Sequence, residues 1–169
     1  MTRLQRSHLA LALGVAISGA ASAPAQQPFN NRQLTVQARI VGDRQKLYDG
    51  SFQGGGRAGI CGVMPKEIVG EDIFVIEFAP EPSGNQTVTA IAFGSKQLVG
   101  TVTKATVFRL SMGLVTANGG RPPSFVINTD TPHMGTGEAT LSRAEGVLTL
   151  TVKGQDDLGA ALTMTITCR

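Results

Sequence analysis

Residues 162–168 alternate strictly between apolar side chains and threonine. The apolar positions are Leu162, Met164, Ile166 and Cys168, and threonine stands at 163, 165 and 167. In an extended chain, this period of two sends one set of side chains to each face of a sheet. The pattern therefore predicts a half-buried strand with Ile166 and Cys168 in the core and Thr165 exposed.

The same alternation recurs along the chain and predicts an all-β fold. Residues 137–168 form three such segments separated by turn residues, which indicates a three-strand meander. Further short strands are expected over residues 34–40, 73–78, 87–93, 103–112 and 124–127, and the only helix-like stretch, 65–69, is short. We expect an antiparallel β-sandwich or a small β-barrel, folded as a single domain over residues 26–169.

The N-terminal segment has the features of a secretory signal peptide. Arg3 and Arg6 precede an apolar run from Leu9 to Ile17, and small residues then lead to Ala25. This order is typical of a cleaved signal, and the apolar run is too short to cross a bilayer as a helix. We therefore expect residues 1–25 to be removed, the protein to be periplasmic or extracellular, and the mature chain to have no transmembrane segment.

Charge and histidine content narrow the function classes. Removing residues 1–25 takes away Arg3 and Arg6, so Lys and Arg fall from 15 to 13 against 12 acidic residues, a net charge of +1. A net charge this close to zero gives no general attraction to the phosphates of nucleic acid, so we expect no nucleic-acid partner. His133 is the only histidine left, which excludes a multi-histidine metal site. We expect no metal and no cofactor, and an unidentified protein or small molecule as partner.

Cys61 and Cys168 are the only cysteines. In an exported protein, an even cysteine count favours pairing. The sequence therefore predicts one disulfide, which would close a loop of 107 residues and hold the C-terminus. The alternative, a reactive thiol, lacks support because neither cysteine has a neighbouring histidine or a Cys-x-x-Cys partner.

Two stretches invite a functional interpretation. The glycine-rich segment 54–62 lacks the Lys-Ser/Thr pair of a phosphate-binding loop, so a loop leading to Cys61 is favoured. Segment 128–138 combines Asp130, His133 and Glu138, which could form a polar site with His133 as a base and Ser124 or Ser142 as a nucleophile. No catalytic motif surrounds these serines, and the simpler interpretation is a solvated loop between strands.

The C-terminal third resembles small mycobacterial surface lipoprotein antigens. The resemblance lies in residues 135–141, 146–154 and 164–169, which end in a Thr-Cys strand like those proteins. It implies an exported, non-enzymatic β-sandwich and assigns no catalytic residue. The cysteine that anchors those proteins to lipid is absent here.

Three functional hypotheses follow. The first is an exported, non-enzymatic β-sandwich that acts as a binding or envelope-associated module. The second is a small periplasmic enzyme centred on His133, and the third is a β-barrel that carries an apolar ligand inside. A filled interior would disfavour the third hypothesis, and a carboxylate held on the His133 ring would favour the second.

Overall fold

The computed structural model describes residues 33–42, 45–54, 59–79, 88–114 and 124–169, with the backbone alone at 45–47. The expected signal peptide, residues 1–25, lies outside the described residues. The strands within them are β1 (Leu34–Gly42), β2 (Gln45–Gly54), β3 (Gly59–Met64), β4 (Ile73–Phe78), β5 (Val88–Ser95), β6 (Lys104–Ala105), β7 (Arg109–Leu114), β8 (Ser124–Asn128), β9 (Thr136–Ala144), β10 (Val147–Gln155) and β11 (Ala161–Cys168). The one described helix, α1 (Lys66–Val69), has four residues.

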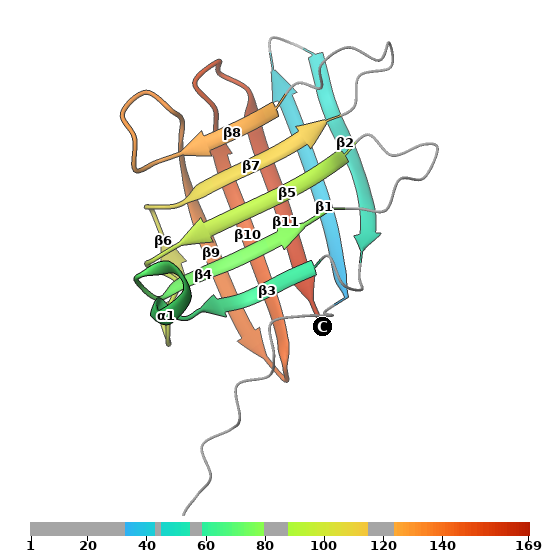
Figure 1. Ribbon diagram of the computed structural model, residues 1–169. Helices are drawn as coiled ribbons and strands as arrows, with labels where there is room; N and C mark the ends of the chain where they lie inside the picture. The colour runs from blue at the N-terminus through green and yellow to red at the C-terminus, as the bar shows by residue number, and fades with distance from the viewer. Residues whose placement is uncertain (1–32, 43–44, 55–58, 80–87, 115–123) are drawn as a thin grey trace, which may run out of the picture.

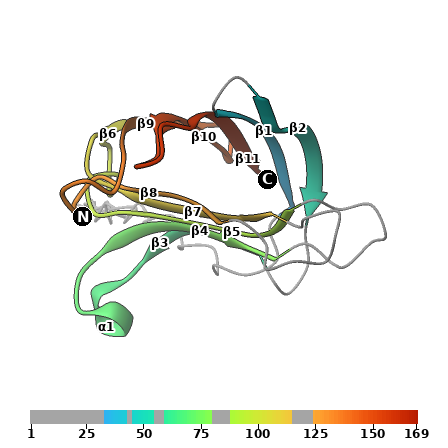
Figure 2. The same ribbon diagram turned by 90° about the horizontal axis from the view of Figure 1, so that it is seen from above.

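The strands form two antiparallel sheets stacked as a sandwich. The six-stranded sheet has the order β2-β1-β11-β10-β9-β6, and the five-stranded sheet has the order β3-β4-β5-β7-β8. Figure 1 shows the strands of one sheet running across those of the other, and Figure 2 shows the two layers from above. The two sheets do not close on each other, so the architecture is the sandwich rather than the barrel.

The predicted C-terminal meander is confirmed as β9, β10 and β11, paired in sequence order. Glu145 and Gly146 join β9 to β10 and both have positive φ, 50° and 78°. A two-residue hairpin loop with this geometry matches the twist of the strands that it connects. Asp156 shapes the next turn, because its Oδ1 accepts hydrogen bonds from the backbone N–H groups of Leu158 (3.0 Å) and Ala160 (2.7 Å).

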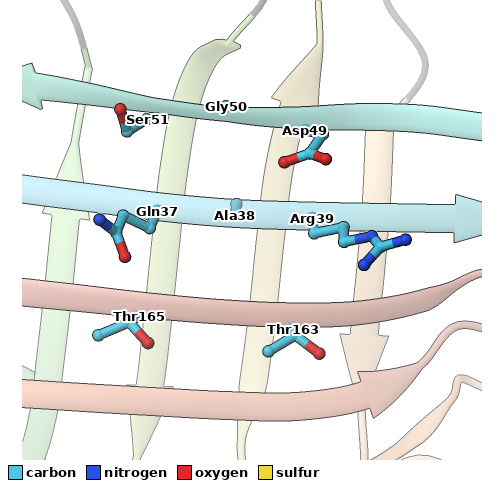
Figure 3. Close-up of a pocket in the computed structure, with 8 residues that line it drawn as sticks. All are labelled: Gln37, Ala38, Arg39, Asp49, Gly50, Ser51, Thr163 and Thr165. Atoms are coloured by element: carbon cyan, nitrogen blue, oxygen red, sulfur yellow. The ribbon is translucent and has the colours of Figure 1, made fainter.

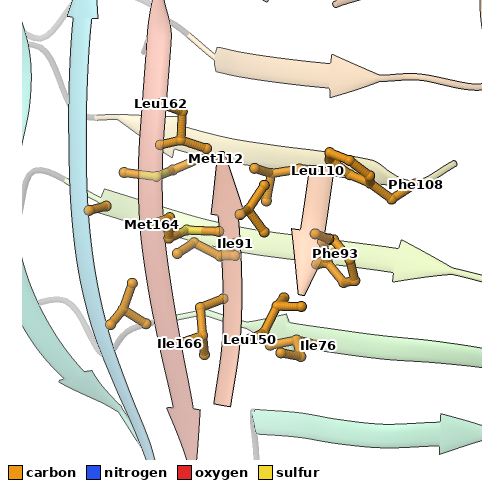
Figure 4. Packing of buried hydrophobic residues seen from close by; sticks show 14 of the residues in the cluster. Ile76, Ile91, Phe93, Phe108, Leu110, Met112, Leu150, Leu162, Met164 and Ile166 are labelled. Carbon is orange, nitrogen blue, oxygen red and sulfur yellow. The ribbon is translucent and has the colours of Figure 1, made fainter. Parts of the chain in front are cut away.

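The apolar sets of the alternating strands meet between the sheets. Figure 4 shows this layer, in which side chains from both sheets pack together. Its largest fully buried members include Ile91 and Met112 from the five-stranded sheet and Leu141 and Leu150 from the six-stranded sheet. These side chains fill the space between the two sheets.

The predicted disulfide is present and lies inside this core. Cys61 on β3 and Cys168 on β11 are bonded, with their Cα atoms 6.5 Å apart and both side chains buried. β3 belongs to the five-stranded sheet and β11 to the six-stranded sheet, so the bond links the two layers directly. In the chain-entropy description, closing so long a loop stabilises the folded state by about 4–5 kcal/mol.

Gly54 permits the close approach of the two sheets at the end of β2. A Cβ atom at this position would overlap the ring of Phe78, which is buried and stacks on Phe52 with ring centroids 5.9 Å apart. The absence of a side chain at Gly54 therefore creates the space that the Phe78 ring fills.

Two expectations need correction. Residues 103–112 are not one strand: β6 ends at Ala105 and β7 begins at Arg109, because the chain leaves the six-stranded sheet and enters the five-stranded one. Gln97 fixes this crossing, since its Oε1 accepts hydrogen bonds from the backbone N–H groups of Thr106 (2.8 Å) and Val107 (3.0 Å).

The second correction concerns Thr165, which is half-buried rather than exposed. Its strand lies in the middle of the six-stranded sheet, so Thr165 is flanked by Gln37 on one side and Thr151 on the other. These neighbours cover part of its surface. Ile166, in contrast, is fully buried as the alternation predicts.

Candidate functional site

The outer face of the six-stranded sheet is covered by an ordered array of polar side chains, here called the hydroxyl face. Strand pairing aligns these side chains in three rows across β2, β1, β11, β10 and β9. The rows are Gln53-Thr35-Thr167-Thr149-Ser142, Ser51-Gln37-Thr165-Thr151-Thr140 and Asp49-Arg39-Thr163-Lys153-Glu138. Directly opposed side chains on neighbouring strands lie about 5 Å apart at Cβ, so each row is a continuous line of hydrogen-bonding groups.

A shallow groove of about 540 Å³ lies on the hydroxyl face over β2, β1 and β11. Figure 3 shows the side chains that line it on these three neighbouring strands. Its polar lining consists of Gln37, Arg39, Asp49, Ser51, Thr163 and Thr165. Ala38 and Gly50 stand opposite each other at core-facing positions of β1 and β2, so they contribute backbone to the floor of the groove. The groove therefore offers hydroxyl, amide and charged groups on one surface.

The middle of the third row has two cations on either side of a hydroxyl, and the acids Asp49 and Glu138 stand at its two ends. Arg39 pairs with Thr163 on β11, and Thr163 pairs with Lys153 on β10. All three side chains are exposed, and among the described residues neither cation forms an ion pair. The backbones of Arg39 and Lys153 are two strand spacings apart, roughly 10 Å. Both side chains are long enough for their charged ends to contact one ligand group above Thr163.

This site was only partly visible in the sequence. The threonine positions of β1, β10 and β11 follow from the alternation in each strand, whereas their alignment in rows requires the strand order. Asp49 and Ser51 were missed, because β2 was not predicted. Its Asp-Gly pair at 49–50 is a common turn signal, and no sequence pattern marked the strand that contains it.

Within the described residues, no hydrogen bond or ion pair joins any two of Asp130, His133 and Glu138, the residues of the predicted polar site. Asp130 and His133 lie in the exposed loop between β8 and β9, and Glu138 lies on β9, opposite Lys153 on the hydroxyl face. No hydrogen bond joins the His133 ring to a carboxylate within the described residues. The described residues also contain no group of histidine, cysteine and acidic side chains that could hold a metal ion.

Local hydrogen bonds explain the shape of this loop. Asn128 Nδ2 donates to Thr131 Oγ1 (2.9 Å), and the Asn128 backbone N–H donates to the carbonyl of Met134 (2.7 Å). His133 has a φ of 62°. Histidine adopts this left-handed region more often than most residues, so a tight turn accounts for the angle. Neither serine proposed as a nucleophile has a hydrogen bond to His133 in the described structure: Ser124 begins β8, and Ser142 belongs to the hydroxyl face.

Another charged pair lies away from the hydroxyl face. Lys96 Nζ contacts Glu71 Oε1 at 2.5 Å, and this hydrogen bond is the main cause that raises the pKa of Lys96. Both side chains are more than half exposed, so the pair contributes little to stability. It is an ordinary surface ion pair.

The structure describes part of the glycine-rich stretch. Residues 55–58 lie outside the described residues, while Gly54 ends β2 and Gly59 begins β3. Cys61 therefore sits on a strand that follows this segment, as expected. No helix begins after it, since β3 is extended from Gly59 to Met64.

Comparisons with known proteins return nothing similar. No protein-family model, no curated protein and no solved structure matches the chain. Among the described residues, no helix combines the length and apolar composition that a membrane crossing needs.

Proposed function

We propose that the protein is an exported, non-enzymatic binding module that holds an anionic polysaccharide of the cell envelope or its surroundings on the hydroxyl face. The observation that carries this proposal is the Arg39-Thr163-Lys153 row, in which two exposed cations without an ion-pair partner among the described residues flank a hydroxyl. Export follows from the expected signal at residues 1–25. The Cys61–Cys168 bond is compatible with an oxidising compartment.

The chemistry of the row selects an acidic ligand. A guanidinium and an ammonium group donate charge-assisted hydrogen bonds to carboxylate, sulfate or phosphate oxygens. Thr163 adds a hydroxyl between them. The groove continues over β1 and β2 with Gln37 and Ser51, which can hydrogen-bond to the hydroxyl groups of sugar rings.

The same face disfavours neutral sugars as ligands. Neutral carbohydrate binding relies on stacking against aromatic rings, and none of the outward-facing positions in the three rows is aromatic. Recognition by charge is therefore the stronger interpretation. After the expected removal of residues 1–25 the net charge is +1, so the chain would attract such a polymer through this local pair of cations rather than through a long-range field.

The two other functional hypotheses find less support in the structure. An enzyme centred on His133 would need a group that orients the imidazole, and the described residues place none on its ring. A carrier of an apolar ligand would need an open interior, whereas buried side chains from both sheets fill the space between them.

Binding of the purified protein to polygalacturonate, with neutral dextran as the comparison, tests the proposal. We expect binding to polygalacturonate and not to dextran, weakening as salt is raised, because the contacts are ionic. Arg39→Gln and Lys153→Gln should each weaken binding about tenfold. Lys66→Gln, which removes an exposed cation on α1, is the matched control and should bind normally.

Two results would contradict the proposal. Equal binding to dextran and polygalacturonate would show that charge is not recognised. Equal losses in Arg39→Gln and Lys66→Gln would show that any attraction is diffuse and does not belong to the hydroxyl face.

A further inference from the structure

The outer face of the five-stranded sheet, here called the apolar face, has fewer polar residues than a solvated surface usually has, although Ser111 and Ser124 face outward. Antiparallel sheets with one face in water alternate apolar residues inside with polar residues outside. The hydroxyl face follows this rule. On β3, β4, β5 and β8, in contrast, most outward positions are apolar or small, among them Ile60, Ile73, Val75, Ala92, Gly94 and Val126.

A groove of about 330 Å³ crosses the middle of the apolar face. Its floor lies over β5. There, Ala92 has only a methyl group and Gly94 has no side chain. Ile73 and Val75 line it from β4. The Cδ1 atom of Ile73 covers part of Gly94, since it lies 3.3 Å from the position that a Cβ atom of Gly94 would take.

Two opposite charges stand on either side of this floor. Glu77 on β4 pairs with Ala92, and Arg109 on β7 pairs with Gly94, so one charge flanks each side of β5. They are the only charged outward residues on the described strands of this sheet, both are exposed, and neither forms an ion pair within the described residues. An acid and a base that face outward beside an apolar groove form a self-complementary surface.

We propose that a second copy of this chain packs face to face on the apolar face. A two-fold axis that lies in the interface and passes over β5 exchanges the positions of Glu77 and Arg109. Glu77 of each copy then meets Arg109 of the other, giving two ion pairs around an apolar centre, as an isologous interface requires. A partner with one sign of charge would leave one of the two residues facing a like charge.

The size of the apolar face sets the strength of this dimer. Five strands about 4.8 Å apart and about six residues long give an area of roughly 400–500 Å². Stable interfaces bury about 800 Å² on each partner, so this one is small. We therefore expect a reversible dimer with a dissociation constant above about 1 µM. In this dimer, both hydroxyl faces point outward.

Sedimentation equilibrium of the full protein, from roughly 1 µM to roughly 1 mM, tests the proposal. We expect a monomer–dimer equilibrium. Arg109→Glu places like charges opposite each other and should weaken association at least about tenfold. Glu77→Arg combined with Arg109→Glu restores opposite charges across the axis and should recover the dimer. Lys104→Glu, a charge reversal on the other sheet, is the control and should leave association unchanged.

Each alternative outcome overturns the proposal. A monomer at all concentrations means that another segment of this chain, or a different protein, covers the apolar face. A dimer that is insensitive to Arg109→Glu forms through another surface. Failure of the double variant to recover the dimer, while circular dichroism shows it folded, means that Glu77 and Arg109 do not face each other.

Discussion

Ile166→Ala should be among the most costly single changes in the six-stranded sheet. Ile166 is fully buried and lies between Val36 on β1 and Leu150 on β10. The substitution removes three carbon atoms, worth about 2.4 kcal/mol at about 0.8 kcal/mol each, before the cavity term is added. β11 is held by a strand on each side and by the disulfide at Cys168, so the site can collapse little. We expect a total loss of about 3–4 kcal/mol.

Urea denaturation followed by circular dichroism measures this loss. The midpoint should fall with an unchanged slope, and the melting temperature should drop by roughly 6–15 °C for a domain of this size. Thr165→Ala is the matched control on the same strand. Because Thr165 faces outward and is half-buried, its replacement should cost less than about 1 kcal/mol. Equal losses at the two positions would refute the assignment of Ile166 to the core and Thr165 to the outer face.

Four further outcomes follow from particular contacts. Non-reduced peptide mapping should recover Cys61 and Cys168 as a linked pair, and replacing both by alanine should cost about 2–5 kcal/mol in urea; two freely alkylatable thiols in the exported protein would contradict this. Gly54→Ala should lower the yield of folded protein or its melting temperature strongly, because the new Cβ overlaps an aromatic ring; a wild-type melting temperature would mean that the sheets are less closely apposed there. Glu145→Asn should stabilise the hairpin by about 0.5–1 kcal/mol, since asparagine tolerates a positive φ better, and a loss in the same assay would argue against the turn geometry. His133→Gly should change the free energy of unfolding by less than about 1 kcal/mol, because glycine accepts the backbone angle and the exposed ring has no partner among the described residues. A loss above about 2 kcal/mol would reveal a contact of the imidazole.

The strands that were predicted from sequence are those in which apolar and polar residues alternate without interruption. The segments that became β9, β10 and β11 have this pattern, and their Gly and Asp residues mark the turns. The disulfide followed from the cysteine count and the expected compartment. These features depend on local chemistry alone.

The features that the sequence did not reveal depend on tertiary contacts. β2 contains Asp49-Gly50 and Gly54, residues of low strand propensity, and pairing with β1 overrides that propensity. The crossing between β6 and β7 depends on Gln97 and Thr129, side chains that reach the backbone from distant positions. The hydroxyl face exists as an array only because β1, at the start of the domain, pairs with β11 at its end.

The contrast between the two outer faces is the basis of both proposals. One face carries hydroxyl groups and two exposed cations, each with an acid opposite it on a neighbouring strand, and the other carries small and apolar residues with one acid and one base. Binding through the first and association through the second would place two ligand surfaces on opposite sides of a dimer. Such an arrangement raises the apparent affinity for a repeating polymer when both surfaces are engaged.

NMR titration of the protein with polygalacturonate locates the binding surface residue by residue. Amide signals of the labelled protein are followed as short polygalacturonate chains are added. We predict that the largest shifts fall on β1, β10 and β11 around Arg39, Thr163 and Lys153, with the signals of the five-stranded sheet unchanged. Shifts confined to the five-stranded sheet or to the His133 loop, or no shifts at all, would contradict the assignment of the hydroxyl face as the binding surface.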